Sequence, residues 1–202
     1  MSQPGLMARF EALSLRPPAA RPDEAVLRAA HAGWLDRQAR RLRDGTAVGA
    51  APWGRPAGRP PVAQPFAEFT LDVLPDGVDA ATVEALADVL ARELDGGWRL
   101  DQLARRAGLV FRVQVKLADL AWWRAVDPAD PWDAGWVRTT PAACDELAVR
   151  FVPRRTTLLL ADADDAAVLA PVRDALLQRA SALPRALRWV WVPRPSCAGG
   201  GG

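Results

Sequence analysis

The chain has 202 residues, enough for one domain with a full hydrophobic core or for one domain with an appendage. Half of the residues are hydrophobic and a quarter are charged, the balance of an ordinary globular protein. No apolar run approaches the roughly 20 residues of a membrane-spanning helix, and no secretory signal is visible at the N-terminus. Two distant cysteines, Cys144 and Cys197, make neither a disulfide framework nor a zinc site. We therefore expect a cytoplasmic protein that does not bind a membrane.

The residue types that the chain lacks are informative. It has no Ile, Asn or Tyr, and Lys116 is its only lysine against 25 arginines. All of these absent or rare types have A/T-rich codons, so we infer a high-GC bacterial genome and assign the arginine excess mainly to codon usage. The net charge of +2 is uneven, because residues 1–65 carry +5 and residues 66–202 carry −3. A basic arm on an acidic body could attract an acidic partner.

The N-terminal arm, residues 1–44, is expected to contain one helix over residues 22–43. Pro22 suits a first helical turn, and the acidic residues after it favour the positive end of the helix. Apolar side chains then recur at helical spacing, with polar breaks. Either the body covers this stripe, which we favour, or a partner does, since an uncovered stripe would promote association. The stripe residues are Leu27, Trp34, Leu35 and Leu42.

A Pro/Gly-rich linker, residues 45–65, separates this arm from the body. Its five Pro and four Gly exclude a regular helix or a central strand. We therefore expect the body, residues 66–192, to fold without the arm. A disordered tail over residues 193–202 is expected after it.

The first part of the body reads as strand, helix and strand. Residues 66–74 alternate between apolar and polar side chains, which predicts a half-buried strand. Asp79 can cap a helix that ends at Gly96 and Gly97, and residues 109–117 alternate again. A short helix over 119–126 and an irregular, Trp-rich loop over 127–141 follow. The apolar stripe of the capped helix consists of Val83, Leu86, Leu90 and Leu94.

The last part of the body predicts a hairpin, a helix and a strand. Residues 147–152 and 156–161 form the hairpin, and the helix covers 165–182, where Pro171 either causes a kink or means a start near Leu169. The final strand covers 188–192, with Trp189 and Trp191 on one face. The fold class is therefore α+β, with mostly antiparallel sheet or sheets and packed helices. Two related β-α-β halves, 66–126 and 142–192, are an option.

Residues 100–109, LDQLARRAGL, resemble the first helix and turn of helix-turn-helix DNA-binding domains. Ala104 is the small residue that allows close helix packing, and Gly108 makes the turn. The segment after it alternates like a strand, where such domains need a polar recognition helix. A DNA-binding regulator with a degenerate helix-turn-helix over 100–120 is therefore one alternative function, and an ordinary helix, turn and strand is the simpler interpretation.

Three acidic residues follow the predicted strand 156–161, and they are the candidate metal ligands: Asp162, Asp164 and Asp165. Their position resembles the magnesium pocket of receiver domains and of haloacid-dehalogenase-like phosphatases, where carboxylates hold a hard cation. Only 37 residues follow Asp165, too few for the βα units that those families need there. Helix capping is therefore the favoured role. We predict no cofactor.

The glycines at 199–202 resemble the flexible tail of ubiquitin-like and sulfur-carrier proteins. This resemblance and the acidic cluster give a second alternative, a small metal-dependent or carrier activity. The only histidine, His31, lies on the predicted N-terminal helix, where no base–nucleophile pair can be built around it. Catalysis therefore has little support.

Nine tryptophans remain, and Trp is frequent at protein-binding hot spots. Those near the predicted loop are candidate partner-binding residues, with core packing as the favoured alternative: Trp122, Trp123, Trp132 and Trp136. Together with the stripe of the N-terminal helix, they lead us to expect a non-enzymatic accessory or protein-interaction protein whose partner is another protein.

Overall fold

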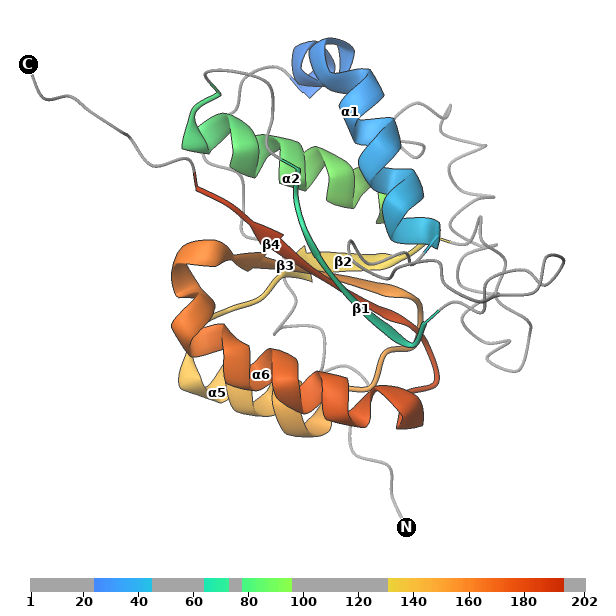
Figure 1. Cartoon of the computed structure of the whole chain (residues 1–202), viewed down its shortest axis with the longest axis vertical. Helices are drawn as coiled ribbons and strands as arrows, with labels where there is room; N and C mark the ends of the chain where they lie inside the picture. Colours follow the sequence, from blue (N-terminus) through green and yellow to red (C-terminus); the bar gives the residue numbers. More distant parts are fainter. Residues whose placement is uncertain (1–23, 45–63, 73–77, 96–130, 195–202) are drawn as a thin grey trace, which may run out of the picture.

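The computed structural model describes residues 24–44, 64–72, 78–95 and 131–194. In this part of the chain, a four-stranded sheet lies between two layers of helices (Figure 1). Helices α1 (Glu24–Asp44) and α2 (Ala80–Asp95) cover one face. The other face is covered by α5 (Pro141–Asp145), the π-helix η2 (Glu146–Arg150) and α6 (Ala166–Arg179). Short 3-10 helices flank α6 on both sides, η3 (Ala163–Asp165) and η4 (Ala180–Ala182).

The sheet is entirely parallel, so the expected antiparallel arrangement is wrong, although the chain does combine helices and strands. The strand order is β1-β4-β3-β2. The chain passes from β2 to β3 through α5 and η2, and from β3 to β4 through α6. Such helical crossovers return the chain to the same end of the sheet, which makes neighbouring strands parallel. The strands are β1 (Phe66–Thr70), β2 (Asp133–Trp136), β3 (Thr157–Asp162) and β4 (Leu187–Val192).

The predicted hairpin is the main local error behind this result. Its second strand exists as β3, but the first, residues 147–152, is largely helical and belongs to η2. Pro141 starts the preceding helix, because its fixed φ suits a first turn. The buried residues Leu147 and Phe151 are four positions apart, a spacing that places them on one helical face. The same pattern also fits strand alternation, since four is a multiple of two.

A strand also lies where the sequence predicted a loop over 127–141. Residues 133–136, DAGW, form β2 and pair in parallel with β3. Asp133, Ala134 and Gly135 are residue types depleted in strands, so the local sequence carries little strand propensity apart from Trp136. Pairing with the apolar strand β3 therefore determines this conformation.

Several other predicted elements are confirmed. The β1 strand, helix α2 and strand β4 lie where the periodicity places them, and the Thr82 N–H donates to Asp79 Oδ1 at 2.7 Å as an N-terminal cap. Helix α6 runs through Pro171, so the alternative start near Leu169 is wrong. The carbonyl that would pair with the missing N–H belongs to Ala167, which is exposed and can bond water instead. The elements expected over 100–126 lie outside the described residues, as do residues 45–63 of the predicted linker 45–65 and residues 195–202 of the predicted tail 193–202.

Each face of the sheet contributes to a separate hydrophobic cluster. Alternate residues of β3 face opposite layers: Leu158 and Leu160 pack with α1 and α2, and Leu159 packs with α6. The two central strands are buried on both faces, which explains why residues 158–161 of β3 are all apolar. Trp189 and Trp191 share the face toward α6, as predicted, with ring centroids 5.4 Å apart in an edge-to-face arrangement.

Helix α1 is part of the first cluster. Its stripe residues Leu27, Trp34, Leu35 and Leu42 are all buried against α2 and the sheet. Polar contacts support this packing, since Arg28 Nη1 lies 2.5 Å from Glu93 Oε2 and the buried Gln38 Nε2 donates to Asp72 Oδ2. The helix thus folds back on the body. The division of the chain into arm, linker and body stays a prediction.

Arg188 of β4 connects the end of α1 to the start of β1 from within the core. Its side chain is almost completely buried, and burial lowers the pKa of its guanidinium. Arginine keeps its proton in proteins, so the buried charge needs acceptors. The Arg188 Nε donates to the carbonyl of Leu42 at 3.0 Å, and Nη1 donates to the carbonyl of Gln64 at 2.9 Å. Arg188 therefore holds together the two chain segments that flank residues 45–63.

Candidate functional site

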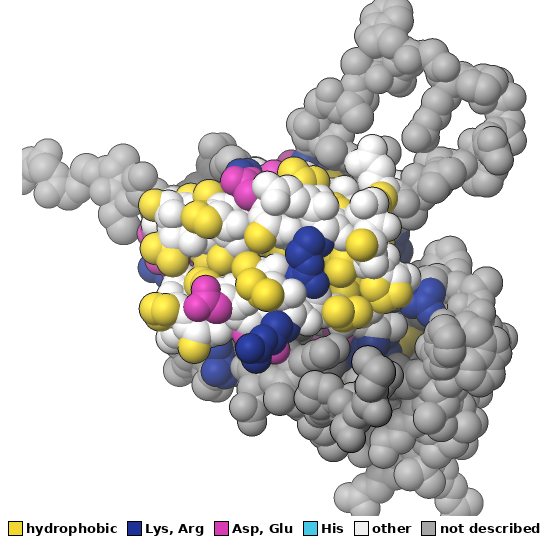
Figure 2. Space-filling view, turned by 90° about the horizontal axis from the view of Figure 1, so that it is seen from below, with side chains coloured by type: hydrophobic (Ala, Val, Ile, Leu, Met, Phe, Trp, Pro, Cys, Tyr) yellow, Lys and Arg dark blue, Asp and Glu magenta, His cyan; other side chains and the backbone are white. Residues whose placement is uncertain are grey.

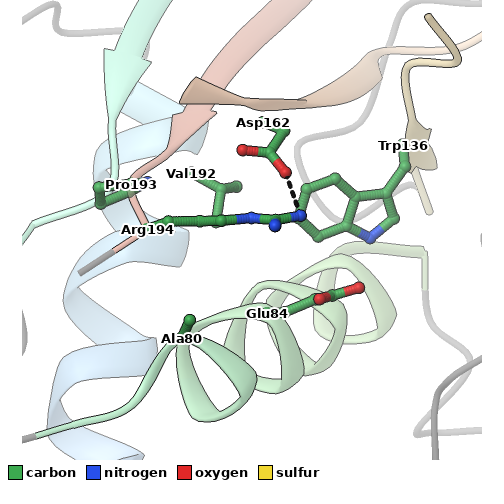
Figure 3. A pocket seen from close by; sticks show the side chains of 7 residues that line it. All are labelled: Ala80, Glu84, Trp136, Asp162, Val192, Pro193 and Arg194. Atoms are coloured by element: carbon green, nitrogen blue, oxygen red, sulfur yellow. Dashed lines mark ion pairs between the residues drawn. The ribbon is translucent and has the colours of Figure 1, made fainter. Parts of the chain in front are cut away.

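A hollow opens at the carboxyl ends of three strands, where parallel α/β sheets commonly bind their ligands. It is partly open to solvent and has about 10 Å³ of space for a water-sized molecule. Strand ends supply most of its wall, and the first turns of α2 supply the rest (Figure 3). The residues that line it are Ala80, Glu84, Trp136, Asp162, Val192, Pro193 and Arg194.

Trp136 is the last residue of β2 and forms the aromatic wall of the hollow. Its indole Nε1–H donates to Asp88 Oδ1 of α2 at 2.7 Å, and both residues are buried. A buried indole N–H needs such an acceptor, and a buried carboxylate needs a donor. This hydrogen bond fixes the orientation of the ring and joins β2 to α2.

The acidic residues after β3 bind an arginine of the same chain. Asp162 Oδ1 accepts from the Asp164 N–H at 3.0 Å and thereby caps η3, while Asp162 Oδ2 lies 2.5 Å from Arg194 Nη2. Asp164 Oδ2 lies 3.8 Å from Arg194 Nε. Asp165 stands at the start of α6 without a side-chain cap bond. Two of the three candidate metal ligands therefore meet at a cation, and within the described ranges no three His, Cys, Asp or Glu side chains are grouped to hold a metal ion.

The chain itself buries the candidate partner-binding residues that the structure describes. The four stripe residues of α1 and the two loop residues Trp132 and Trp136 are buried by the chain itself. Trp132 lies just before β2, and its backbone N–H donates to the backbone carbonyl of Leu94. Trp122 and Trp123 lie outside the described residues. Trp136 is the one of these side chains that also lines the hollow.

An exposed apolar surface lies instead on the layer of α5, η2 and α6. Eleven residues of these three helices are exposed, and seven of them are apolar. Figure 2 views this layer and shows hydrophobic side chains spread over much of its described surface. We call the seven residues the outer helix face: Pro141, Ala142, Val149, Ala167, Val168, Pro171 and Leu177.

The sequence contained a signal for part of this surface. Residues 166–172 of α6 are all apolar, so no placement of the helix could bury all of these side chains. The η2 part was missed because residues 147–152 were assigned to a strand. In the structure, Arg179 joins the two parts, since its guanidinium donates to the carbonyls of Ala148 and Phe151.

Cys144 of α5 does not have the features of an activated nucleophile. Its Sγ lies 3.6 Å from the carbonyl oxygen of Arg138, and burial, with a smaller effect of Asp145, raises the pKa of the thiol. A thiol is reactive as the thiolate, so a raised pKa lowers its reactivity at neutral pH.

The fold and the hollow define a parallel-sheet protein with helices on both faces and an acidic, aromatic hollow at its carboxyl edge. No family model, curated protein or solved structure matches the chain. None of the helices in the described part of the chain is long and apolar enough to cross a membrane.

Proposed function

We propose that this chain is a non-enzymatic interaction or accessory protein that binds another protein through its outer helix face. The observation that carries the proposal is the apolar character of that layer. Four of the five large hydrophobic residues that are exposed in the described part of the chain belong to it or directly follow it: Val149, Val152, Val168 and Leu177. Exposed apolar side chains gathered on one helix layer are typical of a protein-binding site.

The charges on the same layer favour a protein as the partner. Its exposed charged residues are Asp145, Arg150 and Asp174, so both signs occur around the apolar residues. A site that binds nucleic acid requires concentrated positive charge, and so does a site that binds an anionic membrane surface. Apolar residues interspersed with a few charges of both signs, rather than a block of one sign, fit a protein–protein interface.

The test compares proteins captured by the full chain and by surface variants. In Val149→Asp and Val168→Asp, a carboxylate replaces an exposed methyl-bearing side chain, so folding should be retained while an apolar interface would have to bury a charge. The control is Val26→Asp, because Val26 is similarly exposed but lies on α1 in the opposite helix layer. Far-UV circular dichroism and thermal unfolding establish that all variants are folded.

We expect cross-linking in native lysate to join the wild type and the Val26→Asp control to the same protein. That protein should be lost with the Val149→Asp and Val168→Asp variants. The captured protein is then purified, and its dissociation constant should rise at least tenfold for each of the two variants. Equal capture by all four proteins would refute the proposal. If the wild type instead forms a homodimer that Val149→Asp disrupts, the proposal that the outer helix face binds a different protein is refuted.

A further inference from the structure

We propose that the hollow at the carboxyl ends of β2, β3 and β4 is a binding site for a guanidinium group, and that Arg194 is the chain's own occupant of it. This site is separate from the outer helix face and goes beyond the proposed function. Figure 3 shows Arg194 extended across the hollow toward Trp136, with its ion pair to Asp162. A ligand guanidinium would displace Arg194 and take over these contacts.

The lining of the hollow fits a cation. Among the described residues that line it, Glu84 and Asp162 are acidic, and Arg194 is the one cation. Without Arg194, the hollow would present the carboxylate of Asp162 and the indole of Trp136. Carboxylates attract a cation, and an indole ring attracts one through its negative face.

Two of these groups are held in place before any ligand arrives. The Asp162 side chain is only 12% exposed, and one of its oxygens is occupied by the Asp164 N–H, so the other oxygen is left to face the cation. The indole of Trp136 is fixed by its hydrogen bond to Asp88. Pre-organised acceptors lose little conformational freedom on binding.

The occupant shows which cation the site accepts. Arg194 presents Nη2 to Asp162 and Nε to Asp164 from one planar group. A guanidinium can contact two carboxylates from different edges of its plane, whereas an ammonium is a compact point charge with a different arrangement of donors. We therefore expect the site to prefer guanidinium over ammonium.

Arg194 can leave this position without disturbing the core. Its side chain is 46% exposed, and it lies two residues beyond the end of β4. Exposed ion pairs contribute little to folding stability. Arg194 is therefore an intramolecular competitor, which weakens the binding of an external guanidinium without preventing it.

The experiment uses the full chain and the variant Arg194→Gln, which keeps the length of the side chain and removes its charge. Isothermal titration calorimetry measures the binding of N-acetyl-arginine amide, with the citrulline and lysine analogues as controls. We expect Arg194→Gln to bind the arginine probe at least tenfold more tightly than the wild type does. Adding Asp162→Asn to this variant should weaken its binding at least tenfold.

A site-specific readout comes from the indole N–H signals in nitrogen-15 NMR spectra. The signal of Trp136, assigned with the variant Trp136→Phe, should shift when the arginine probe is added and stay in place with the citrulline analogue. Arg194→Lys is a second variant that keeps a positive charge but removes the guanidinium. It should bind the arginine probe more tightly than the wild type does, even if Arg194→Gln is poorly folded.

Two results would overturn the proposal. One is equal binding of the arginine probe, or none, by the wild type and both Arg194 variants. The other is binding that Asp162→Asn leaves unchanged. If the proposal holds, the peptide Gly-Gly-Arg-Gly-Gly distinguishes the source of the ligand: tenfold tighter binding than the amide indicates an arginine in a protein segment, and equal binding indicates a small guanidinium compound.

Discussion

Replacing Trp34 by Ala tests whether α1 belongs to the hydrophobic core. Trp34 is only 6% exposed and packs in the cluster that α1 forms with α2 and the sheet. Truncation of a buried Trp to Ala costs about 3–5 kcal/mol, because it removes apolar burial and leaves a cavity. The indole Nε1–H of Trp34 has no hydrogen-bond partner among the described residues, and an unpaired buried donor costs about 1–3 kcal/mol in the native state.

The unpaired N–H lowers the expected loss. Its penalty disappears together with the indole, so mid-range values of about 4 and about 2 kcal/mol leave an expected reduction of the free energy of unfolding of about 2 kcal/mol for Trp34→Ala. Trp34→Phe keeps most of the ring and removes the N–H, so it should change stability by less than about 1.5 kcal/mol. On the same helix, Val26 is 62% exposed, and Val26→Ala should stay within about 0.5 kcal/mol of the wild type.

Urea unfolding followed by circular dichroism at equilibrium measures these differences. For a chain of this size, a loss of about 2 kcal/mol corresponds to a decrease in Tm of about 4–8 °C. The expected order of stability is wild type, Val26→Ala and Trp34→Phe close together, with Trp34→Ala clearly lower. If Trp34→Ala unfolds at the same urea concentration as Val26→Ala, the packing of α1 does not contribute to the core and the reasoning is wrong.

Three further predictions concern single polar groups. Arg188→Met should cost about 2–5 kcal/mol, because the carbonyls of Leu42 and Gln64 lose a charged donor. Arg150→Met, at an exposed i,i+4 pair, should cost less than about 0.5 kcal/mol, and thermal unfolding compares the two variants. The hydrogen bonds of Thr82 hold the pKa of Asp79 below its ordinary value. The stabilising effect of the Asp79 carboxylate is therefore fully present at a pH above the ordinary pKa of Asp, and it is lost as the pH falls through the lowered pKa. The stability difference between the wild type and Asp79→Ala should therefore vanish in acid, and a constant difference down to pH 2 would contradict this. In a Cys197→Ser background, Cys144 should react with Ellman's reagent more slowly at neutral pH than a free thiol does, and an equal rate would contradict the raised pKa of Cys144.

The sequence predicted most elements correctly where one period dominates. Helix α2 has a capping Asp79 and a regular apolar stripe, and β4 combines β-branched and aromatic residues, so both were found. Leu147 and Phe151 are spaced for either period, and the sequence gives no local reason to choose the helix. Strand β2 depends on its pairing with β3, a contact that no local pattern can show.

The burial of α1 could be predicted in part. The spacing of Leu27, Trp34, Leu35 and Leu42 indicated that something covers the helix, and the structure shows that α2 and the sheet do so. The contribution of Arg188 was not foreseeable, because its acceptors lie on either side of residues 45–63, 146 and 124 positions from Arg188 itself. Independent folding of residues 66–192 was expected from the linker composition. The shared core leads us to expect instead that a chain without α1 loses stability.

The hollow and the direction of the strands could only have been predicted together. Glu84, Trp136, Asp162 and Arg194 are separated by up to 110 residues, and they meet because β2, β3 and β4 all end at the same edge of the sheet. In the expected antiparallel hairpin arrangement, neighbouring strands end at opposite edges, which would separate such residues by the length of a strand. The helical assignment of residues 141–150 makes β2 and β3 parallel and so brings Trp136 beside Asp162. The wrong assignment of this one short helical segment therefore concealed both the parallel direction of the strands and the hollow.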